Sequence, residues 1–496
     1  MEKFDLVIIG AGPSGYAAAM RGLDLGKKVC LIEKDKIGGA AIYNGALSSK
    51  TLWEIANKVN DINIFPHLKS DTPYKMDWED VQFALNEAIE ERKSQYITQL
   101  EILESMKSSV EFSLKKGIGS FISDHEIQIT TAVNNEIIWG ENIIIATGSR
   151  PFIPTNIPVD EKHIFSSDGI EHIKDYPKSI VIIGGGVIGC EYATIFANFG
   201  QTKVYLIDRQ ERILPFEDID LATLVSKNLE EKGVTIHHKS SLDRIEVIDN
   251  EIEYQISHPS GEIEVIRVEK AFLAVGRIPN HEALCIDRAG IKMSKRGYHI
   301  GDHNTQTNIP HIFVVGDVSG RITLVNMGEI EGRYAVKKAY GIIDEPLNYD
   351  NVCTIMFLNP EVACIGVNEQ HCVAHNIPVK VVKIDYSLIA RAIAMRKTEG
   401  FVKIIVTNDE EMRILGMRVV GEHASSAIQA IGLLIKMNVS IEHLAELVHP
   451  HPSIVEGIQE CVRMLLNKSI LKSSILKDKA ACYALINGEK IDLEYL

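Results

Sequence analysis

The sequence lacks several features that would mark a membrane or nucleic-acid-binding protein. No apolar run approaches the roughly 18 residues that a transmembrane helix needs. Lys and Arg total 52 against 67 Asp and Glu, which gives a formal net charge of −15. A field of that sign disfavours binding to nucleic acid or to an anionic membrane surface. The N-terminal stretch is too short and too acidic to be a signal peptide.

Paired cysteines are also missing. The chain has 8 cysteines, and none of them forms a Cys-x-x-Cys or a five-apart pair. This usage is typical of a reducing compartment and excludes a small disulfide-stapled scaffold. We therefore expect a cytoplasmic protein with no partner of the nucleic-acid or membrane kind.

The composition that is present is that of a large globular protein. The chain has 496 residues, of which 45% are hydrophobic and 24% charged, with 36 Gly and 16 Pro. At about 150 residues per domain, this length predicts about three domains. A multi-domain enzyme is the class that fits best.

One β-α-β pattern occurs twice along the chain. In each copy a short apolar run ends at a glycine cluster, a helical segment follows, and a second apolar run ends at an acidic residue. The first copy comprises 5–9, 16–25 and 28–33, and the second comprises 179–183, a helix to 198, and 203–208. Such a doubled module predicts an α/β fold with buried parallel strands.

The segments between and after the modules are less regular. We expect a long solvated helix over 78–106, antiparallel strands at 110–114 and 127–130, and a buried strand at 142–146. From about residue 350 short β-runs (379–384 and 401–406) mix with helices such as 424–436. The last stretch, 472–496, is predicted to be a surface tail.

The glycine clusters have the spacing of a dinucleotide-binding fingerprint. Glu33 lies 18 residues past the last glycine of its cluster, and Asp208 lies 19 past the last of the second. The glycines allow a tight turn, close approach of a pyrophosphate and helix–strand packing, while the acid binds a ribose hydroxyl. Two such sites in one chain most simply indicate a flavin reduced by a nicotinamide. The fingerprint residues are Gly10, Gly12, Pro13, Ser14, Gly15 and Glu33, then Gly184, Gly186, Gly189 and Asp208.

The choice between NAD and NADP is less determined by the sequence. Asp208 favours NAD, because a carboxylate would repel the 2′-phosphate of NADP. Arg209 and Arg212 follow directly, and arginines at such positions can accommodate that phosphate. We therefore favour NAD(H) and leave NADP(H) open.

With these motifs placed, the chain resembles the class I pyridine nucleotide-disulfide oxidoreductases, which include dihydrolipoamide dehydrogenase, glutathione reductase, mercuric reductase and the soluble transhydrogenase. The pattern is nearest to dihydrolipoamide dehydrogenase, and the resemblance runs from residue 4 to about 470. It is carried by the sequences ATGSRP at 146–151, AVGRIPN at 274–280, FVVGDV at 313–318, PEVA at 360–363 and HPHPSIVE at 449–456.

The resemblance implies two Rossmann-like dinucleotide-binding domains, for FAD and NAD(P), and a C-terminal α+β dimerisation domain. The implied boundaries are 1–155 and 279–350 for the two parts of the FAD and central unit, 156–278 for the NAD(P) unit, 351–472 for dimerisation and 473–496 for the tail. By resemblance Asp317 binds the flavin ribityl chain and Gly148 lies close to the cofactor. The other implied cofactor-binding residues are Thr147, Gly276, Gly316 and Lys50.

The chain departs from the family at its redox centre. Relatives carry two cysteines, with four residues between them, that form the disulfide beside the flavin. By resemblance Ala41 and Ala46 occupy those two positions. A methyl group forms neither a thiolate nor a mixed disulfide, so the family's dithiol chemistry is not expected here.

Other catalytic positions of the family are matched. Lys50 and Glu191 match a lysine–glutamate pair beside flavin N5, where a positive charge stabilises reduced flavin. His451 and Glu456 match the acid–base pair, which in the family is contributed by the partner subunit. No metal site is expected.

Three functions remain open from the sequence. The favoured one is an FAD-dependent NAD(P)H oxidoreductase that reduces a non-dithiol acceptor, such as a quinone or a second nicotinamide. The second is a dihydrolipoamide dehydrogenase whose cysteines were replaced or lost, and the third is a non-catalytic FAD/NAD-binding scaffold or redox sensor. A homodimer is expected, and association with a larger dehydrogenase complex remains open.

Overall fold

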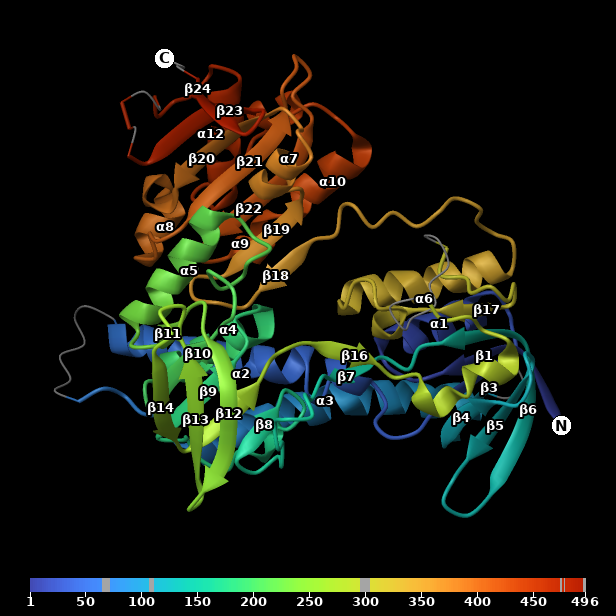
Figure 1. The fold of residues 1–496 in the computed structure, drawn as a ribbon. Helices are drawn as coiled ribbons and strands as arrows, with labels where there is room; N and C mark the ends of the chain where they lie inside the picture. The colour runs from blue at the N-terminus through green and yellow to red at the C-terminus, as the bar shows by residue number, and fades with distance from the viewer. Residues whose placement is uncertain (65–71, 107–110, 295–303, 473–474, 477, 494–496) are drawn as a thin grey trace.

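The computed structural model describes residues 1–64, 72–106, 111–294, 304–472, 475–476 and 478–493. Figure 1 shows three lobes: one with the N-terminal strands and α6, one with the green strands of the middle of the chain, and one with the orange and red C-terminal elements. Each lobe is built on its own main β-sheet.

The first lobe contains a seven-stranded sheet in the order β3-β2-β1-β6-β5-β4, with β17 also paired to β6. Its central strands β1 and β6 are apolar toward their carboxyl ends, where both faces are covered; Leu6, Val7 and Ile8 are all fully buried. The strands are β1 (Glu2–Ile9), β2 (Val29–Glu33), β3 (Phe112–Lys116), β4 (Ile118–Phe121), β5 (Glu126–Thr130), β6 (Asn135–Ile145) and β17 (Ile312–Val314).

Helices α1, α3 and α6 contact this sheet, whereas α2 packs against α3 and against α4 (Val187–Phe199) of the second lobe. α1 begins with Pro13 at its first turn, where the missing N–H costs nothing. It packs closely on α6, since a Cβ on Gly332 would lie 2.2 Å from the carbonyl oxygen of Ser14. The helices are α1 (Pro13–Asp24), α2 (Ala46–Ile64), α3 (Trp78–Ser105) and α6 (Val325–Ala339).

The second lobe has a five-stranded parallel sheet in the order β11-β10-β9-β15-β8. A three-stranded antiparallel sheet, β12-β13-β14, accompanies it. The elements are β8 (Ile164–Ser166), β9 (Ser179–Ile183), α4 (Val187–Phe199), β10 (Lys203–Ile207), α5 (Ile219–Glu231), β11 (Thr235–His237), β12 (Ser241–Ile248), β13 (Glu251–Ser257), β14 (Ile263–Val268) and β15 (Lys270–Leu273). The short pair β7 (Ser149–Pro151) and β16 (Arg277–Pro279) marks the two points where the chain passes between these lobes.

The third lobe contains a seven-stranded antiparallel sheet in the order β18-β19-β22-β21-β20-β23-β24. Its strands are β18 (Thr354–Met356), β19 (Val362–Gly366), β20 (Val379–Asp385), β21 (Phe401–Thr407), β22 (Ile414–Val420), β23 (Ala480–Ile486) and β24 (Glu489–Asp492). Its helices are α7 (Glu369–Ala374), α8 (Ala390–Met395), α9 (Ala424–Ala427), α10 (Gln429–Met437), α11 (Glu442–Ala445) and α12 (Val455–Leu465).

The structure corrects three expectations. The predicted surface tail is wrong over residues 480–492, because β23 pairs with β20 and buries an apolar face. The strand predicted at 110–114 is parallel to β2, not antiparallel, and residue 110 lies outside the described residues. The helix predicted over 424–436 is divided into α9 and α10.

Candidate functional site

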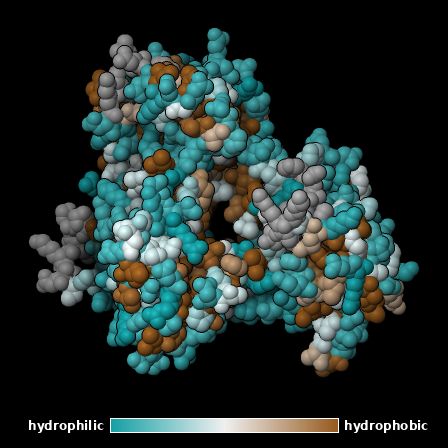
Figure 2. Space-filling model, in the orientation of Figure 1, coloured by the Kyte–Doolittle hydropathy of each residue, from teal (hydrophilic) through white to brown (hydrophobic). Residues whose placement is uncertain are grey.

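A cleft of about 1780 Å³ brings the two fingerprints together. The molecule is hollowed where its lobes face one another (Figure 2). Of the predicted site positions, the following line the cleft: Gly10, Gly12, Pro13, Ser14, Glu33, Ala41, Ala46, Lys50, Thr147, Gly148, Gly184, Gly186, Glu191, Asp208, Gly276 and Asp317. Five do not line it: Gly15, Gly189, Gly316, His451 and Glu456.

The three glycines of each fingerprint have three different environments. The first adopts positive φ, +109° at Gly10 and +111° at Gly184, and leaves no room for a side chain. A Cβ there would lie 2.3 Å or 2.4 Å from the carbonyl oxygen at the end of the next buried strand, Ala146 or Ala274. The turn between strand and helix is therefore open only to glycine.

Of the other two glycines in each fingerprint, one allows close helix–strand packing and one leaves space for a ligand. A Cβ on Gly15 or Gly189 would lie 1.9 Å or 1.8 Å from the first glycine's carbonyl oxygen, so these residues let the helix press against the strand. A Cβ on Gly12 or Gly186 would meet nothing within 4 Å. These open positions are at the N-termini of α1 and α4, where a pyrophosphate is favoured by the helix dipole.

The acidic residue of each fingerprint is held by backbone N–H groups. Glu33 accepts hydrogen bonds from the backbone of Ala11 at 2.7 Å and of Asp35 at 2.8 Å. Asp208 accepts them from Gly185 and Gln210, both at 2.6 Å. Each carboxylate is thus fixed beside the glycine turn with lone pairs left for a ribose. Both fingerprints fit a dinucleotide.

The two arginines after Asp208 have different environments. Arg212 donates hydrogen bonds to the carbonyl oxygens of Pro215 at 3.1 Å and Glu217 at 2.8 Å, and it does not line the cleft. Arg209 lines the cleft and is exposed. Of these two, only Arg209 is placed to meet a 2′-phosphate.

Lys50 and Glu191 meet although 141 residues separate them in the chain. α2 carries the lysine and α4 the glutamate, and Nζ lies 2.8 Å from Oε2. The Glu191 side chain is only 5% exposed, and its second oxygen accepts a hydrogen bond from the backbone of Phe357 at 3.0 Å. Because both oxygens of this buried carboxylate are hydrogen-bonded, it fixes the Lys50 ammonium group at the cleft wall.

Ala41 and Ala46 stand at two ends of one short segment of the same wall. Ala41 ends a 3₁₀ turn over Gly39–Ala41, and Ala46 is the first residue of α2. Both line the cleft with Lys50. This wall therefore carries two methyl groups beside the fixed ammonium.

Among the residues that the structure describes, no disulfide takes the place of the pair that Ala41 and Ala46 lack, and all eight cysteines are free. Cys353 is the one cysteine in the cleft lining. Cys190 adjoins Glu191 but is fully buried, with Sγ 3.4 Å from the carbonyl oxygen of Gly185. Burial raises the pKa of the Cys190 thiol far above its ordinary value, so it is an inert core residue.

Asp317 is positioned by residues that the sequence analysis did not identify. Ser149 donates a hydrogen bond to it at 2.6 Å. Beneath the same turn, the fully buried Glu331 accepts hydrogen bonds from the backbone of Gly316 at 2.5 Å and from the Tyr349 hydroxyl at 2.8 Å. Burial raises the pKa of Glu331, although these bonds oppose the shift. The sequence signal for this residue was its position in α6, where Glu331 stands beside Gly332, the glycine that packs against α1.

His451 and Glu456 form a pair away from the cleft of their own chain. Nδ1 of the histidine lies 2.7 Å from Oε1 of Glu456, and the second carboxylate oxygen accepts a hydrogen bond from the backbone of Ser453 at 2.8 Å. Partial burial raises the pKa of Glu456, but the bonds from His451 and Ser453 outweigh it, so the net shift is downward. His451 is 71% exposed, so its second nitrogen is available to another molecule or subunit.

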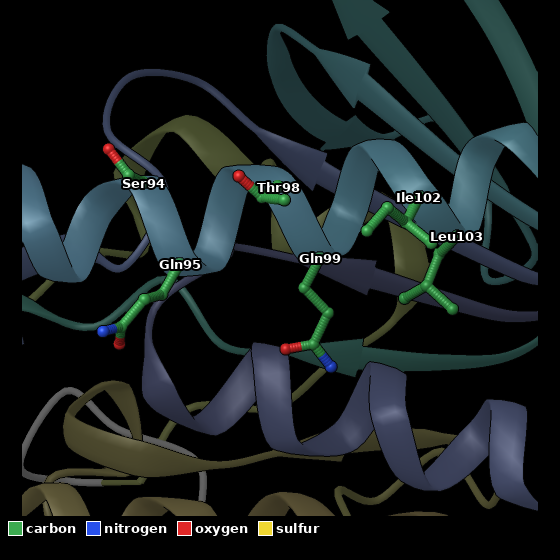
Figure 3. A pocket seen from close by; sticks show the side chains of 6 residues that line it. All are labelled: Ser94, Gln95, Thr98, Gln99, Ile102 and Leu103. Carbon is green, nitrogen blue, oxygen red and sulfur yellow. The ribbon is translucent and has the colours of Figure 1, made fainter.

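A smaller hollow of about 520 Å³ lies on α3, away from both fingerprints. Figure 3 shows Gln99 pointing toward α1, where it accepts a hydrogen bond from the Tyr16 hydroxyl at 2.6 Å. No titratable side chain lines this hollow; its residues are Ser94, Gln95, Thr98, Gln99, Ile102 and Leu103. The candidate site is the large cleft.

The chain belongs to the pyridine nucleotide-disulphide oxidoreductase family. The family model matches residues 4–332, and the model of the family's dimerisation domain matches residues 352–462. The resemblance seen in the sequence is thereby confirmed, as is the α/β fold. The chain is a flavin-dependent oxidoreductase; the family supports FAD and a pyridine nucleotide as cofactors, and the dimerisation domain supports a homodimer.

Individual relatives lie in the same group. The chain is 32% identical over 463 residues to dihydrolipoyl dehydrogenase of Chlamydia trachomatis, covering 92% of this chain and 95% of the relative. It is 31% identical over 462 residues to that of Bacillus subtilis, covering 92% and 97%. The fold is similar to the Cu(II) complex of the HOCl-induced flavoprotein disulfide reductase RclA from Escherichia coli, with a TM-score of 0.83, 25% identity, and 94% of this chain and 100% of that chain covered. In the described part of the chain, no helix is long and apolar enough to cross a membrane.

Proposed function

We propose that this chain is an FAD-dependent NADH oxidoreductase that reduces a small acceptor other than a dithiol. The observation that carries the proposal is the pair Ala41 and Ala46 in the cleft wall beside Lys50. By resemblance these are the two positions of the family's redox cysteines. Neither methyl group can hold a sulfur intermediate, and the space they leave suits a small acceptor such as a quinone or a second nicotinamide.

The first fingerprint would hold FAD and the second a nicotinamide nucleotide. Gly12 would admit the FAD pyrophosphate to the N-terminus of α1, Glu33 would bind the ribose, and Asp317 would bind the ribityl chain. Gly186 and Asp208 would do the same for the nicotinamide nucleotide. When bound, FAD supplies a two-electron carrier between NADH and the acceptor. The residues contribute mainly by fixing the distance between the two ligands.

Lys50 would contribute positive charge where negative charge develops on reduction. Its ammonium is held by Glu191, so no reorganisation is needed at the moment of reaction. Such an ordered pair favours an active enzyme over a non-catalytic scaffold, which has no use for a buried carboxylate that positions a lysine at the cleft.

Proton transfer would come from His451 of the partner subunit. In its own chain this histidine is exposed and lies outside the cleft, which suits a residue that completes the site of a second chain. Glu456 would orient the ring through its hydrogen bond to Nδ1. A quinone would take two electrons and one proton from NADH as a hydride equivalent, and its second proton would come from this imidazole. A second nicotinamide would take the hydride equivalent alone.

NADH is the proposed donor. The carboxylate of Asp208 is held by the backbone N–H groups of Gly185 and Gln210. There it would bind the ribose and would repel a 2′-phosphate. Arg212 is occupied by backbone carbonyls, so it offers that phosphate no compensation.

Anaerobic reduction tests the proposal. NADH should bleach the visible flavin absorbance of the purified protein, and re-oxidation should follow with a quinone, oxygen or thio-NAD but not with lipoamide. Cys353→Ser, which removes the cleft's one described cysteine, should leave these rates unchanged. Dihydrolipoamide:NAD turnover would contradict the dithiol-free mechanism. Failure of both NADH and NADPH to bleach the flavin would leave a scaffold.

A further inference from the structure

Three potential metal ligands converge in the second lobe, at the end of β11. His237 is the last residue of β11, His258 follows β13, and Glu264 lies in β14. One ligand atom from each lies within 4.8 Å of the others. None of the three lines the cleft described above.

The distances are near those of a three-ligand metal centre. Nε2 of His258 lies 3.1 Å from Oε2 of Glu264, and Nδ1 of His237 lies 3.9 Å from the same oxygen. In a tetrahedral zinc site with bonds of about 2.0–2.1 Å, neighbouring ligand atoms lie about 3.3 Å apart. The two imidazole planes are inclined at 47° with centroids 5.9 Å apart, which leaves room for an ion between them.

A second hydrogen-bond partner holds the His258 ring from outside the cluster. Oγ of Ser240 donates to the carbonyl oxygen of His238 at 2.9 Å and lies 3.2 Å from Nδ1 of His258. With the hydroxyl hydrogen on that carbonyl, Ser240 accepts from Nδ1–H of His258. An ion at Nε2 would take the place of the hydrogen bond that joins Nε2 to Glu264 at 3.1 Å. A second hydrogen bond that fixes a ligating imidazole in this way is typical of metal sites.

His237 is a buried ring without a hydrogen-bond partner in the described part of the chain. Its side chain is only 9% exposed, and Nε2 is buried and unpaired. Nδ1 points toward Glu264 from 3.9 Å, which is too far for a hydrogen bond. Nδ1 is the ring nitrogen that lies toward Glu264, so an ion among the three ligands would bind there.

Two other clusters of similar composition do not offer such a site. Asp218, Asp220 and Glu369 surround the ammonium of Lys403, which lies 2.6–2.8 Å from each of them. His125 and His311 stack at 3.8 Å with an interplanar angle of 5°. Their lone pairs then lie in parallel planes and do not converge on one ion.

We propose that His237, His258 and Glu264 bind a divalent transition-metal ion of the zinc type. Two imidazoles and one carboxylate are ligands that zinc prefers, and the exposed side of Glu264 leaves a fourth position for water. The ion would join β11 to the β13–β14 turn. It would also act next to the nucleotide site, because Ser240 lines the cleft and its N–H is bonded to the carbonyl oxygen of Asp208 at 3.0 Å.

Equilibrium dialysis against Zn²⁺, followed by metal counting, tests the site on the full FAD-containing protein without a histidine tag. One zinc per chain is expected in this site. His258→Gln and Glu264→Gln should each weaken its binding about tenfold or more. Zinc K-edge absorption should report nitrogen and oxygen ligands and no sulfur.

Matched controls are His125→Gln from the stacked pair and His371→Gln from an exposed histidine pair on α7. Both should retain the zinc of the parent protein. An unchanged flavin spectrum and elution volume identify folded variants, and either ligand variant alone suffices for the test. The proposal is overturned if the parent binds no zinc at tens of micromolar, if His258→Gln and Glu264→Gln bind it as the parent does, or if sulfur appears in the coordination shell.

Discussion

Replacing Lys403 by Met should destabilise the chain by about 3–5 kcal/mol, the usual cost of breaking a buried ion pair. Lys403 is completely buried in β21, and three carboxylates approach its ammonium within 2.8 Å. Burial lowers its pKa, but Asp220, Glu369 and Asp218 outweigh this, so the net shift is upward. The contact joins the second lobe, through Asp218 and α5, to the sheet of the third.

The loss is not shared equally by the three carboxylates. Asp220 keeps Lys383, 2.6 Å away, and Glu369 keeps the hydroxyl of Tyr483 at 2.8 Å. Asp218 is only 3% exposed and loses its one ion-pair partner among the described residues. Most of the predicted loss therefore comes from leaving the Asp218 charge buried and unpaired.

The destabilisation by Lys403→Met should depend on pH. In the parent, burial raises the pKa of Asp220, but Lys403 and Lys383 lower it by more, so the net shift is downward. The stabilisation from this carboxylate is therefore present above the unfolded pKa of about 3.9 and is lost as pH falls through the lower folded pKa. Lys403 is one of the two groups that lower this pKa, so the destabilisation of the variant should be largest at pH 8 and smaller at pH 3.

Urea denaturation at the two pH values measures this. Lys380→Met, which removes an ammonium that contacts only the exposed carbonyl of Asp409 in the described structure, should change the free energy of unfolding by less than about 0.5 kcal/mol. A Lys403→Met loss below about 1 kcal/mol at pH 8, or a loss that grows toward pH 3, would refute the reasoning.

Three further predictions concern the cleft. Asp208→Asn should raise KM for NADH about tenfold or more and lower the preference for NADH over NADPH, because it removes a charge while keeping an acceptor for Gly185; steady-state rates with both donors decide this, and a stronger NADH preference would contradict it. His451→Gln should lower acceptor turnover about 10²-fold or more at neutral pH while leaving anaerobic flavin bleaching by NADH intact; unchanged turnover would remove its acid–base role. Gly12→Ala should fold, since its Cβ would meet no protein atom, but it should lose FAD because the methyl group would occupy the space of the pyrophosphate. Gly15→Ala should also lower the melting temperature, since its Cβ would lie 1.9 Å from a carbonyl oxygen. Equal melting temperatures of the two variants would contradict this distinction.

Most of the helices and strands could be predicted from local sequence patterns. The strand at 179–183 was predicted with its observed bounds, and the helices after both glycine clusters were placed within a few residues, because glycine turns and apolar runs are dictated by nearby residues. The pairing of Lys50 with Glu191 was reached through the family resemblance, since no local signal joins positions so far apart. Parallel pairing of β3 was missed, because the partner of a strand is chosen by tertiary contacts.

The site was predicted less completely than the fold. Both acids and the open glycines lie on the cleft as expected, but the commitment of Arg212 to two carbonyl oxygens depends on a turn that the sequence does not specify. Glu331 and Lys403 were overlooked although each is a charged residue within an apolar or small-residue face. Such residues are expensive to bury and in both cases form the centre of a polar network.

The two C-terminal strands have a practical consequence for protein engineering. β23 covers the edge of β20, and Tyr483 reaches the Lys403 cluster through Glu369. The family's dimerisation-domain model ends at residue 462. Shortening the chain at residue 472, just beyond that model, would uncover a strand edge of the kind on which chains aggregate. A variant for crystallisation or biosensor use should therefore retain β23 and β24 and carry any fused domain beyond them.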